Sequence, residues 1–111
     1  MVPAPDIRIV LSTAGSREEA QRIAHALIHE QLAACVNLVP GVHSIYRWQG
    51  KVENAEELLL LIKTTAANLD RVEAALRAAH SYELPEFLVL TPESGSEAYV
   101  RWFLEASQPP Q

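Results

Sequence analysis

Apolar and polar positions alternate in blocks that predict first a strand and then a helix. The block from Ile7 to Thr13 is apolar and β-branched, which is typical of a strand, and Gly15 interrupts it. Ser16 and Glu19 have the spacing of a capping box, in which the serine caps a helix and the glutamate reaches back to it. The apolar residues that follow have helical spacing: Ala20, Ile23, Ala24, Leu27 and Ile28. The helix is therefore expected to extend to about Leu32.

Two long β-like runs in the middle of the chain predict a hairpin. They extend from Ala34 to Trp48 and from Lys51 to about Thr65, and the pair Gln49-Gly50 makes the turn between them. The pair Pro40-Gly41 interrupts the first run. Because proline cannot donate a hydrogen bond to a neighbouring strand, we expect a bulge, a bend or a sheet edge at this point.

The remaining blocks predict a second helix, a fourth strand and a third helix. Helical spacing covers Asn68 to His80, and the run from Glu86 to Thr91 is strand-like. Ser94 and Glu97 offer a second cap for a short helix from Ala98 to Ala106. The order β-α-β-β-α-β, followed by a helix, is that of a ferredoxin-like α+β sandwich, with both main helices on one face of an antiparallel sheet.

The apolar block from Leu58 to Ile62 places large side chains on both faces of its strand. Leu59 and Leu61 alternate with the other three residues, so one set points away from the helices. Burying a leucine fully stabilises by roughly 1.5–3 kcal/mol, so a wet face is unfavourable. Either another copy of the sheet covers this face, which we favour and which predicts binding sites between subunits, or the C-terminal helix folds over it.

Composition narrows the class of protein. The chain has 111 residues, 49% of them hydrophobic, which predicts a single domain over residues 1–111, with an ordered core from about 6 to 106 and a tail from 107 to 111. The net charge of −5 and the scattered basic residues argue against nucleic acid or an anionic membrane as a partner. A single cysteine, no secretory signal and no run of membrane-span length favour a cytoplasmic location.

Several short motifs occur in an order that is typical of one family. They are Leu32-Ala-Ala-Cys-Val-Asn37, Pro40-Gly41, Tyr46-Arg-Trp-Gln-Gly-Lys51, Leu61-Ile-Lys-Thr-Thr65, His80-Ser-Tyr-Glu-Leu-Pro-Glu86 and Tyr99-Val-Arg-Trp102. The series resembles the CutA family of divalent-cation tolerance proteins. The resemblance implies a homotrimer of ferredoxin-like subunits, whose long hairpin strands extend to their neighbours. It also implies a role in tolerance of copper and other divalent ions, with no firmly attached catalysed reaction.

His80 and Glu86 are the candidate metal ligands. An imidazole suits copper or zinc, and a carboxylate in the same segment can turn toward the same ion. His80 occupies the histidine position of the family's H-P-Y-x-x-P-E motif, with Ser81 in place of the first proline, so the resemblance implies a copper-binding role for it. Ser12 and Ala79 stand where some family members have the other suggested ligands. The alternative is a ligand-free histidine at a helix C-terminus, favoured there by the macrodipole.

A second candidate site is a ligand pocket between subunits, lined by Tyr46, Trp48, Lys63 and Tyr82 together with Glu86. Aromatic walls with one or two opposed charges suit a small polar or anionic ligand. The alternative is that these large side chains only pack an interface.

The remaining reactive residues have structural interpretations. His25 and His29 are spaced i, i+4 on a solvated helix face, where they can still bind metal adventitiously. Cys35 is interpreted as a small residue packed in the core. The chain contains no G-x-S-x-G, Walker, H-E-x-x-H or C-x-x-C motif, so no enzyme activity is expected.

Three functions stay open at this point. The first is a homotrimer in divalent-metal response that binds copper or another divalent cation, with no metal required for folding. The second is a trimeric signalling or small-molecule-binding protein whose ligand occupies the clefts between subunits. The third is a structural module that organises another protein, although the sequence identifies no hetero-partner.

Overall fold

The chain forms an α+β structure, and the computed structural model describes residues 1–108. In chain order the elements are β1 (Val2–Pro3), β2 (Ile7–Ala14), α1 (Arg17–His29), β3 (Cys35–Trp48), β4 (Lys51–Thr65), a 3₁₀ turn (Ala66–Asn68), α2 (Leu69–Ala79), β5 (Leu88–Leu90), β6 (Ser94–Gly95) and α3 (Glu97–Ala106). Positions 109–111 of the predicted tail lie outside the described residues. Helix α3 ends at Ala106, and Ser107 follows it as a buried C-cap whose hydroxyl donates to the carbonyl of Phe103.

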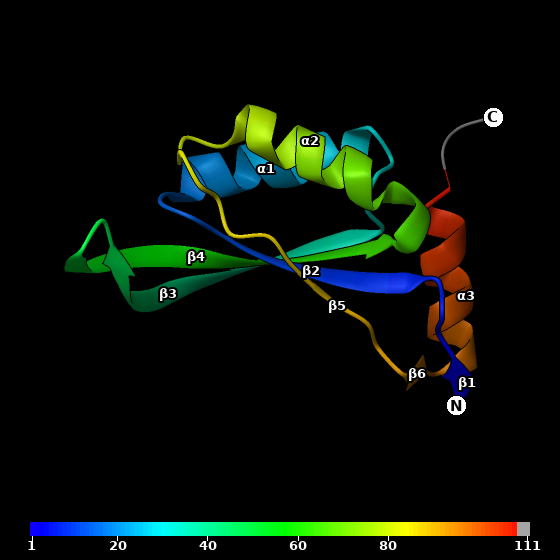
Figure 1. Cartoon of the computed structure of the whole chain (residues 1–111). Coiled ribbons are helices and arrows are strands. Elements are labelled where there is room, and N and C mark those ends of the chain that lie inside the picture. The colour runs from blue at the N-terminus through cyan, green and yellow to red at the C-terminus, as the bar shows by residue number, and fades with distance from the viewer. Residues whose placement is uncertain (109–111) are drawn as a thin grey trace.

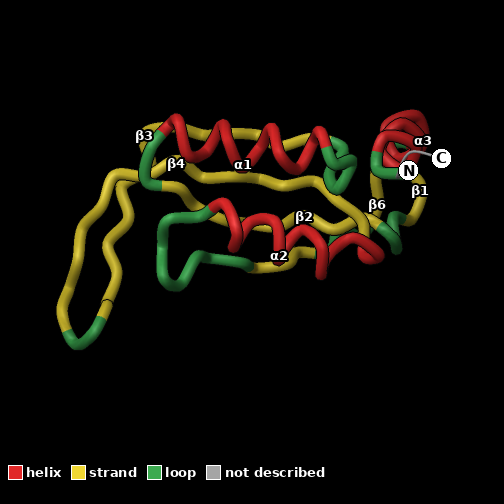
Figure 2. Tube along the Cα trace, turned by 90° about the horizontal axis from the view of Figure 1, so that it is seen from above, coloured by secondary structure: helices red, strands yellow, loops and turns green. Residues whose placement is uncertain are grey.

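Four antiparallel strands form the main sheet, in the order β3-β4-β2-β5. Helices α1 and α2 lie side by side and cover the same face of this sheet (Figures 1 and 2). The sheet with two helices on one face confirms the predicted ferredoxin-like fold.

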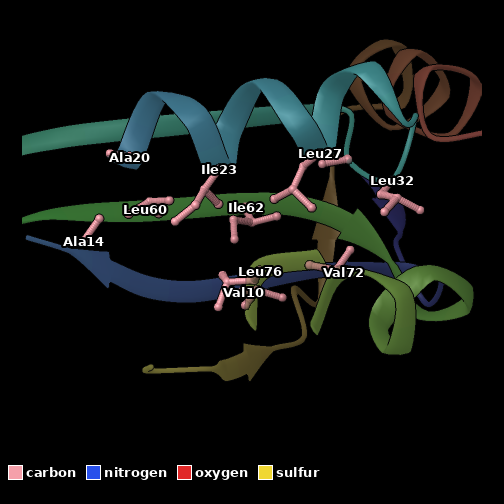
Figure 3. Close-up of a cluster of buried hydrophobic side chains, with 11 residues drawn as sticks. Val10, Ala14, Ala20, Ile23, Leu27, Leu32, Leu60, Ile62, Val72 and Leu76 are labelled. Carbon is pink, nitrogen blue, oxygen red and sulfur yellow. The ribbon is translucent and has the colours of Figure 1, made fainter. Parts of the chain in front are cut away.

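The main core fills the layer between the two helices and the sheet (Figure 3). Leu60 and Ile62 are fully buried, and the register places them beside Ser12 and Val10 of β2, so both strands present alternate side chains to the helices. The buried apolar cluster consists of Val10, Ala14, Ala20, Ile23, Leu27, Leu32, Ala33, Leu60, Ile62, Val72 and Leu76.

Helix α1 begins as predicted but ends earlier. The Ser16 hydroxyl accepts the backbone N–H of Glu19, as in a capping box, whereas the Glu19 carboxylate turns toward His80 instead of returning to Ser16. The helix ends at His29, not near Leu32, because Gln31 has a left-handed backbone with φ of 56°. This turn brings the Leu32 carbonyl to the hydroxyl of Thr64, 2.6 Å away, and ties the helix end to β4.

The predicted hairpin is confirmed, with its turn at Gln49 and Gly50. Both residues have positive φ, 50° and 79°, as a two-residue turn of matching twist requires. The strand register shifts between Val39 and Val42, and Gly41 has φ of 78°, so of the three predicted possibilities at Pro40-Gly41 the structure shows a bulge.

The far half of the hairpin extends beyond the sheet as a two-stranded ribbon (Figure 2). Pairing of β2 with β4 stops at Ala14 and Leu58, so within the described chain the segment Lys51–Glu57 pairs with β3 alone. A two-stranded ribbon is at best marginally stable by itself in water. Packing against another surface would therefore stabilise this half of the hairpin.

The C-terminal part departs from the sequence prediction in two places. Strand β5 is limited to Leu88–Leu90 instead of Glu86–Thr91, because the Glu86 carbonyl accepts the Ser12 hydroxyl rather than a ladder N–H. Ser94 does not cap α3: with Gly95 it forms β6, which pairs with β1.

The N-terminal residues before position 6 are part of the structure as well. Helix α3 packs at the end of the sheet, where it forms a second buried cluster with the N-terminal segment: Ala4, Ile7, Val100 and Phe103. Neither β1 nor this cluster was predicted from the sequence.

The sheet face opposite α1 and α2 is apolar and partly exposed. Leu59 and Leu61 belong to this face, since their neighbours Leu60 and Ile62 point into the core. On β5, Leu88 and Leu90 share the face and are 58% and 50% exposed, so α3 does not cover them. We call this surface the open face. None of the described helices is long and apolar enough to cross a membrane.

Candidate functional site

A cavity of about 620 Å³ lies between the ribbon and the segment that connects α2 to β5. Tyr46 and Trp48 line it from β3. The hairpin register pairs them with Glu53 and Lys51, so strand alternation puts both aromatic side chains on the same ribbon face as Glu57, which also lines the cavity. Tyr82, from the connecting segment, completes the aromatic wall.

A hydrogen bond between Tyr82 and Glu57 closes one side of the cavity. The Tyr82 hydroxyl donates to Oε2 of Glu57 at 2.7 Å, and Glu57 is only 7% exposed. Burial, followed by this hydrogen bond and the negative charge of Glu57, raises the pKa of Tyr82 well above its usual value, so the phenol stays protonated. The same hydroxyl lies close to Gly15, where an added Cβ would be 3.1 Å from it.

His80 is a buried structural residue in this arrangement. It is the C-cap of α2, and its Nε2–H donates to the carbonyl of Thr13 at 2.6 Å while its Nδ1 accepts the backbone N–H of Tyr82 at 3.1 Å. A neutral imidazole has one donor and one acceptor, so both are occupied. Oε1 of Glu19 lies 3.3 Å from Nδ1 and is buried without a hydrogen-bond partner among residues 1–108. Metal coordination by His80 would require one of its hydrogen bonds to break.

The second predicted metal ligand, Glu86, faces the cavity. It is exposed, while the His80 side chain has no exposed surface and does not line the cavity. Ser12 is fully buried and donates to the Glu86 carbonyl, which gives it a structural role. Among residues 1–108, no three or more His, Cys, Asp or Glu side chains are grouped so that they could hold a metal ion.

Lys63 is the predicted pocket residue that the structure places elsewhere. Its ammonium lies 6.0 Å from the ring centroid of Tyr99 on α3, and it does not line the cavity. Tyr46, Trp48, Tyr82 and Glu86 do lie together there. Among the described lining residues the cavity wall therefore carries no positive charge, and this bears on the class of ligand that it can accept.

Glu57 and Glu83 also line the cavity, and neither was predicted from the sequence to do so. The position of Glu57 could have been predicted from the sequence. A two-residue turn at Gln49-Gly50 fixes the strand register, and this register places Glu57 on the same face of the hairpin as Tyr46 and Trp48. The hydrogen bond from Tyr82 had no such signal, because the two residues are distant along the chain and only the fold brings them together.

The other reactive residues lie away from the cavity. His25 and His29 are exposed on α1, with ring centroids 6.1 Å apart, which confirms the solvated helix face. Cys35 is only partly buried and pairs with Lys63 on the open face, so its predicted place in the core is wrong.

Comparison with known proteins gives a consistent result. Residues 8–106 match the family model described as "CutA1 divalent ion tolerance protein". The divalent-cation tolerance protein CutA of Thermus thermophilus is 47% identical over 97 residues, which cover 87% of this chain and 94% of that protein. A solved structure of the divalent cation tolerance protein from Thermus thermophilus matches this chain with a TM-score of 0.85 and 46% identity. The match covers 87% of this chain and 94% of that one.

A CutA from Synechococcus elongatus, solved in complex with a Bis-Tris molecule, is 38% identical with a TM-score of 0.87. The match covers 95% of this chain and 97% of that one. The extent of the family match and the identity to the Thermus protein agree with the fold described above. The chain belongs to the CutA family of divalent-cation tolerance proteins.

Proposed function

We propose that the protein acts in divalent-cation tolerance as a homotrimer that binds ligands without converting them. The observation that carries the trimer is the apolar open face, which continues into the unpartnered ribbon. Leu88, Leu90 and Val39 expose between 40% and 58% of their surface there. Burial of each leucine would contribute up to roughly 1.5–3 kcal/mol, and the ribbon would gain a surface to pack on.

Molar mass in solution tests the assembly. Light scattering on the eluting protein should give three times the chain mass of 12.3 kDa. Leu90→Glu places a charge on the open face and should shift the protein toward monomer. Ile28→Glu is the matched control, because Ile28 is 41% exposed on α1, on the helix side of the sheet, and it should leave the mass unchanged. A monomeric wild-type protein would refute the trimer.

The cavity supports a second candidate function, binding of a small molecule. It joins residues from the ribbon and from the segment after α2, and its volume lies within the range of small-molecule sites. The relative from Synechococcus elongatus that was solved with Bis-Tris adds support from the family. The engagement of both His80 nitrogens favours this candidate over a tight metal site.

Copper binding stays a separate prediction, with His80 and Glu86 as its ligands. It is best tested in a His25→Ala/His29→Ala background, because an exposed i, i+4 histidine pair can bind copper independently. Substoichiometric Cu(II) should then broaden the ring-proton NMR signals of His80 before those of His43. Equal or absent broadening would remove the prediction. The cytoplasmic location is likewise a proposal, supported by the single cysteine.

A further inference from the structure

We propose that the cavity between the ribbon and the segment after α2 binds a small organic ammonium cation. This inference rests on the small-molecule function proposed above and names the chemical class of its ligand. It differs from the polar or anionic ligand that the sequence predicts, and the difference follows from the side chains that the fold brings to the cavity wall.

The walls of the cavity provide aromatic surfaces. Tyr46 and Trp48 line it from the ribbon, and Tyr82 lines it from the connecting segment. The negative face of an aromatic ring attracts a cation within about 6 Å of its centroid, and tryptophan and tyrosine are the strongest such rings. Several aromatic side chains on one cavity are the arrangement by which proteins recognise quaternary and alkylated ammonium groups.

The charge of the wall has the sign that such a ligand needs. Glu57, Glu83 and Glu86 line the cavity, and no lysine, arginine or histidine is found among the described lining residues. Lys63, the cation expected there, lies instead over Tyr99. On the wall that this chain provides, an anion would meet three carboxylates with no counter-charge among the described lining residues, whereas an ammonium group would be attracted to them.

Glu57 is the central anion of this site. It is more than nine-tenths buried, and the Tyr82 hydroxyl holds only its Oε2. Removal of the carboxylate from bulk water strengthens its attraction for a cation in the cavity, because the effective dielectric constant is lower there. Tyr82 both fixes the direction of this carboxylate and presents its own ring to the ligand.

The same wall is unsuited to bare magnesium or calcium. The carboxylates are not grouped as a metal site within residues 1–108. Magnesium and calcium require about six or more oxygen ligands, and aromatic faces cannot replace them. A cavity of about 620 Å³ has room for an alkylammonium ligand with polar substituents.

Trp48 fluorescence provides a direct assay on the full-length protein. The chain has two tryptophans, so Trp102→Phe on α3 leaves Trp48 as the only one and serves as the reference protein. Choline is titrated as the probe, beside its neutral isostere in which carbon replaces the quaternary nitrogen. Acetate and phosphate are titrated as anions, at constant ionic strength. We expect saturable quenching by choline and at least about tenfold weaker binding of the isostere, equivalent to the loss of about 1.4 kcal/mol.

Two variants locate the interaction. Glu57→Gln removes the charge and keeps an acceptor for the Tyr82 hydroxyl, and it should weaken choline binding at least about tenfold. Glu56→Gln is the matched control: it removes the same charge at the adjacent, exposed position, whose side chain points to the other ribbon face, and should change affinity less than about twofold. Circular dichroism verifies that both variants are folded.

Each outcome decides the proposal. Binding of the isostere as tightly as choline, tighter binding of an anion, or equal effects of the two variants would overturn the ammonium class. No quenching by any probe, with no heat of binding in calorimetry, would overturn it as well. Light scattering on the same samples separates this result from the trimer: a trimer without choline binding refutes the ligand alone, and a monomer refutes the assembly.

Discussion

The hydrogen bond between Tyr82 and Glu57 gives a sharp prediction for stability. Tyr82→Phe removes one oxygen and leaves Oε2 of a carboxylate that is 7% exposed without its partner. A hydrogen bond to a charged group contributes about 1.5–3 kcal/mol, and the partial exposure of Tyr82 favours the lower end. We therefore expect Tyr82→Phe to lower the free energy of unfolding by about 1.5 kcal/mol at neutral pH.

The pH dependence of this difference has a definite sign. The pKa of Tyr82 is raised in the folded protein above its ordinary value of 10.0, first by burial and then by Glu57. The contribution of Tyr82 is therefore complete below pH 10. Above pH 10 the tyrosine of the unfolded chain loses its proton while the folded one keeps it, which stabilises the unfolded state. Above pH 10, the difference in the free energy of unfolding between wild type and Tyr82→Phe should therefore decrease, by at most about 1.4 kcal/mol per pH unit.

Urea titrations at one fixed protein concentration measure both effects, because the stability of an oligomer depends on concentration. Tyr46→Phe is the matched control: Tyr46 lines the same cavity, is 45% exposed, and its hydroxyl makes no hydrogen bond within residues 1–108. It should change stability by less than about 0.5 kcal/mol. The reasoning is refuted if both variants lose equal stability, or if the gap for Tyr82→Phe stays constant or widens from pH 9 to pH 11.

Three further predictions concern the core, His80 and the hairpin turn. Leu60→Ala should lower the free energy of unfolding by about 2–5 kcal/mol in urea, because the side chain is fully buried; a loss under 1 kcal/mol would contradict the described core. His80→Ala should cost about 2–4 kcal/mol, since two buried backbone groups lose their partners, whereas the exposed His43→Ala should cost under about 0.5 kcal/mol. Gly50→Ala should cost about 1 kcal/mol because its φ is 79°, and unchanged stability would argue against this turn geometry.

The main sheet and its hairpin could be predicted because their signals are local. A two-residue turn fixes the register of two strands. The apolar run from Leu58 to Ile62 showed that both faces of its strand are apolar, and the structure shows that Leu60 and Ile62 are the set that the helices cover. The irregularity at Pro40-Gly41 could be predicted for the same reason, because proline and glycine restrict or permit conformations of their own backbone. The two-sided strand also indicated an apolar face opposite the helices, and the exposed Leu88 and Leu90 agree with it.

The parts that could not be predicted depend on contacts that are distant in sequence. Nothing near Val2 signals a strand, since β1 exists only because β6 passes beside it. The end of α1 was predicted three residues late because the bond from Thr64 to the Leu32 carbonyl, which fixes that end, comes from another element. Lys63 was predicted to line a pocket between subunits, but within this chain its side chain lies over Tyr99, which belongs to a helix whose position the sequence did not give.

His80 connects the two candidate functions, which affects how its variants are interpreted. Its Nδ1 accepts the N–H of Tyr82, and Tyr82 holds Glu57 on the cavity wall. Loss of His80 therefore displaces the cavity wall even if the imidazole never touches a ligand or a metal ion. A loss of copper or choline binding in His80→Ala is expected from either role. Only a signal from the imidazole itself, or a loss in Glu57→Gln with the His80 bonds intact, separates coordination by His80 from its support of Tyr82.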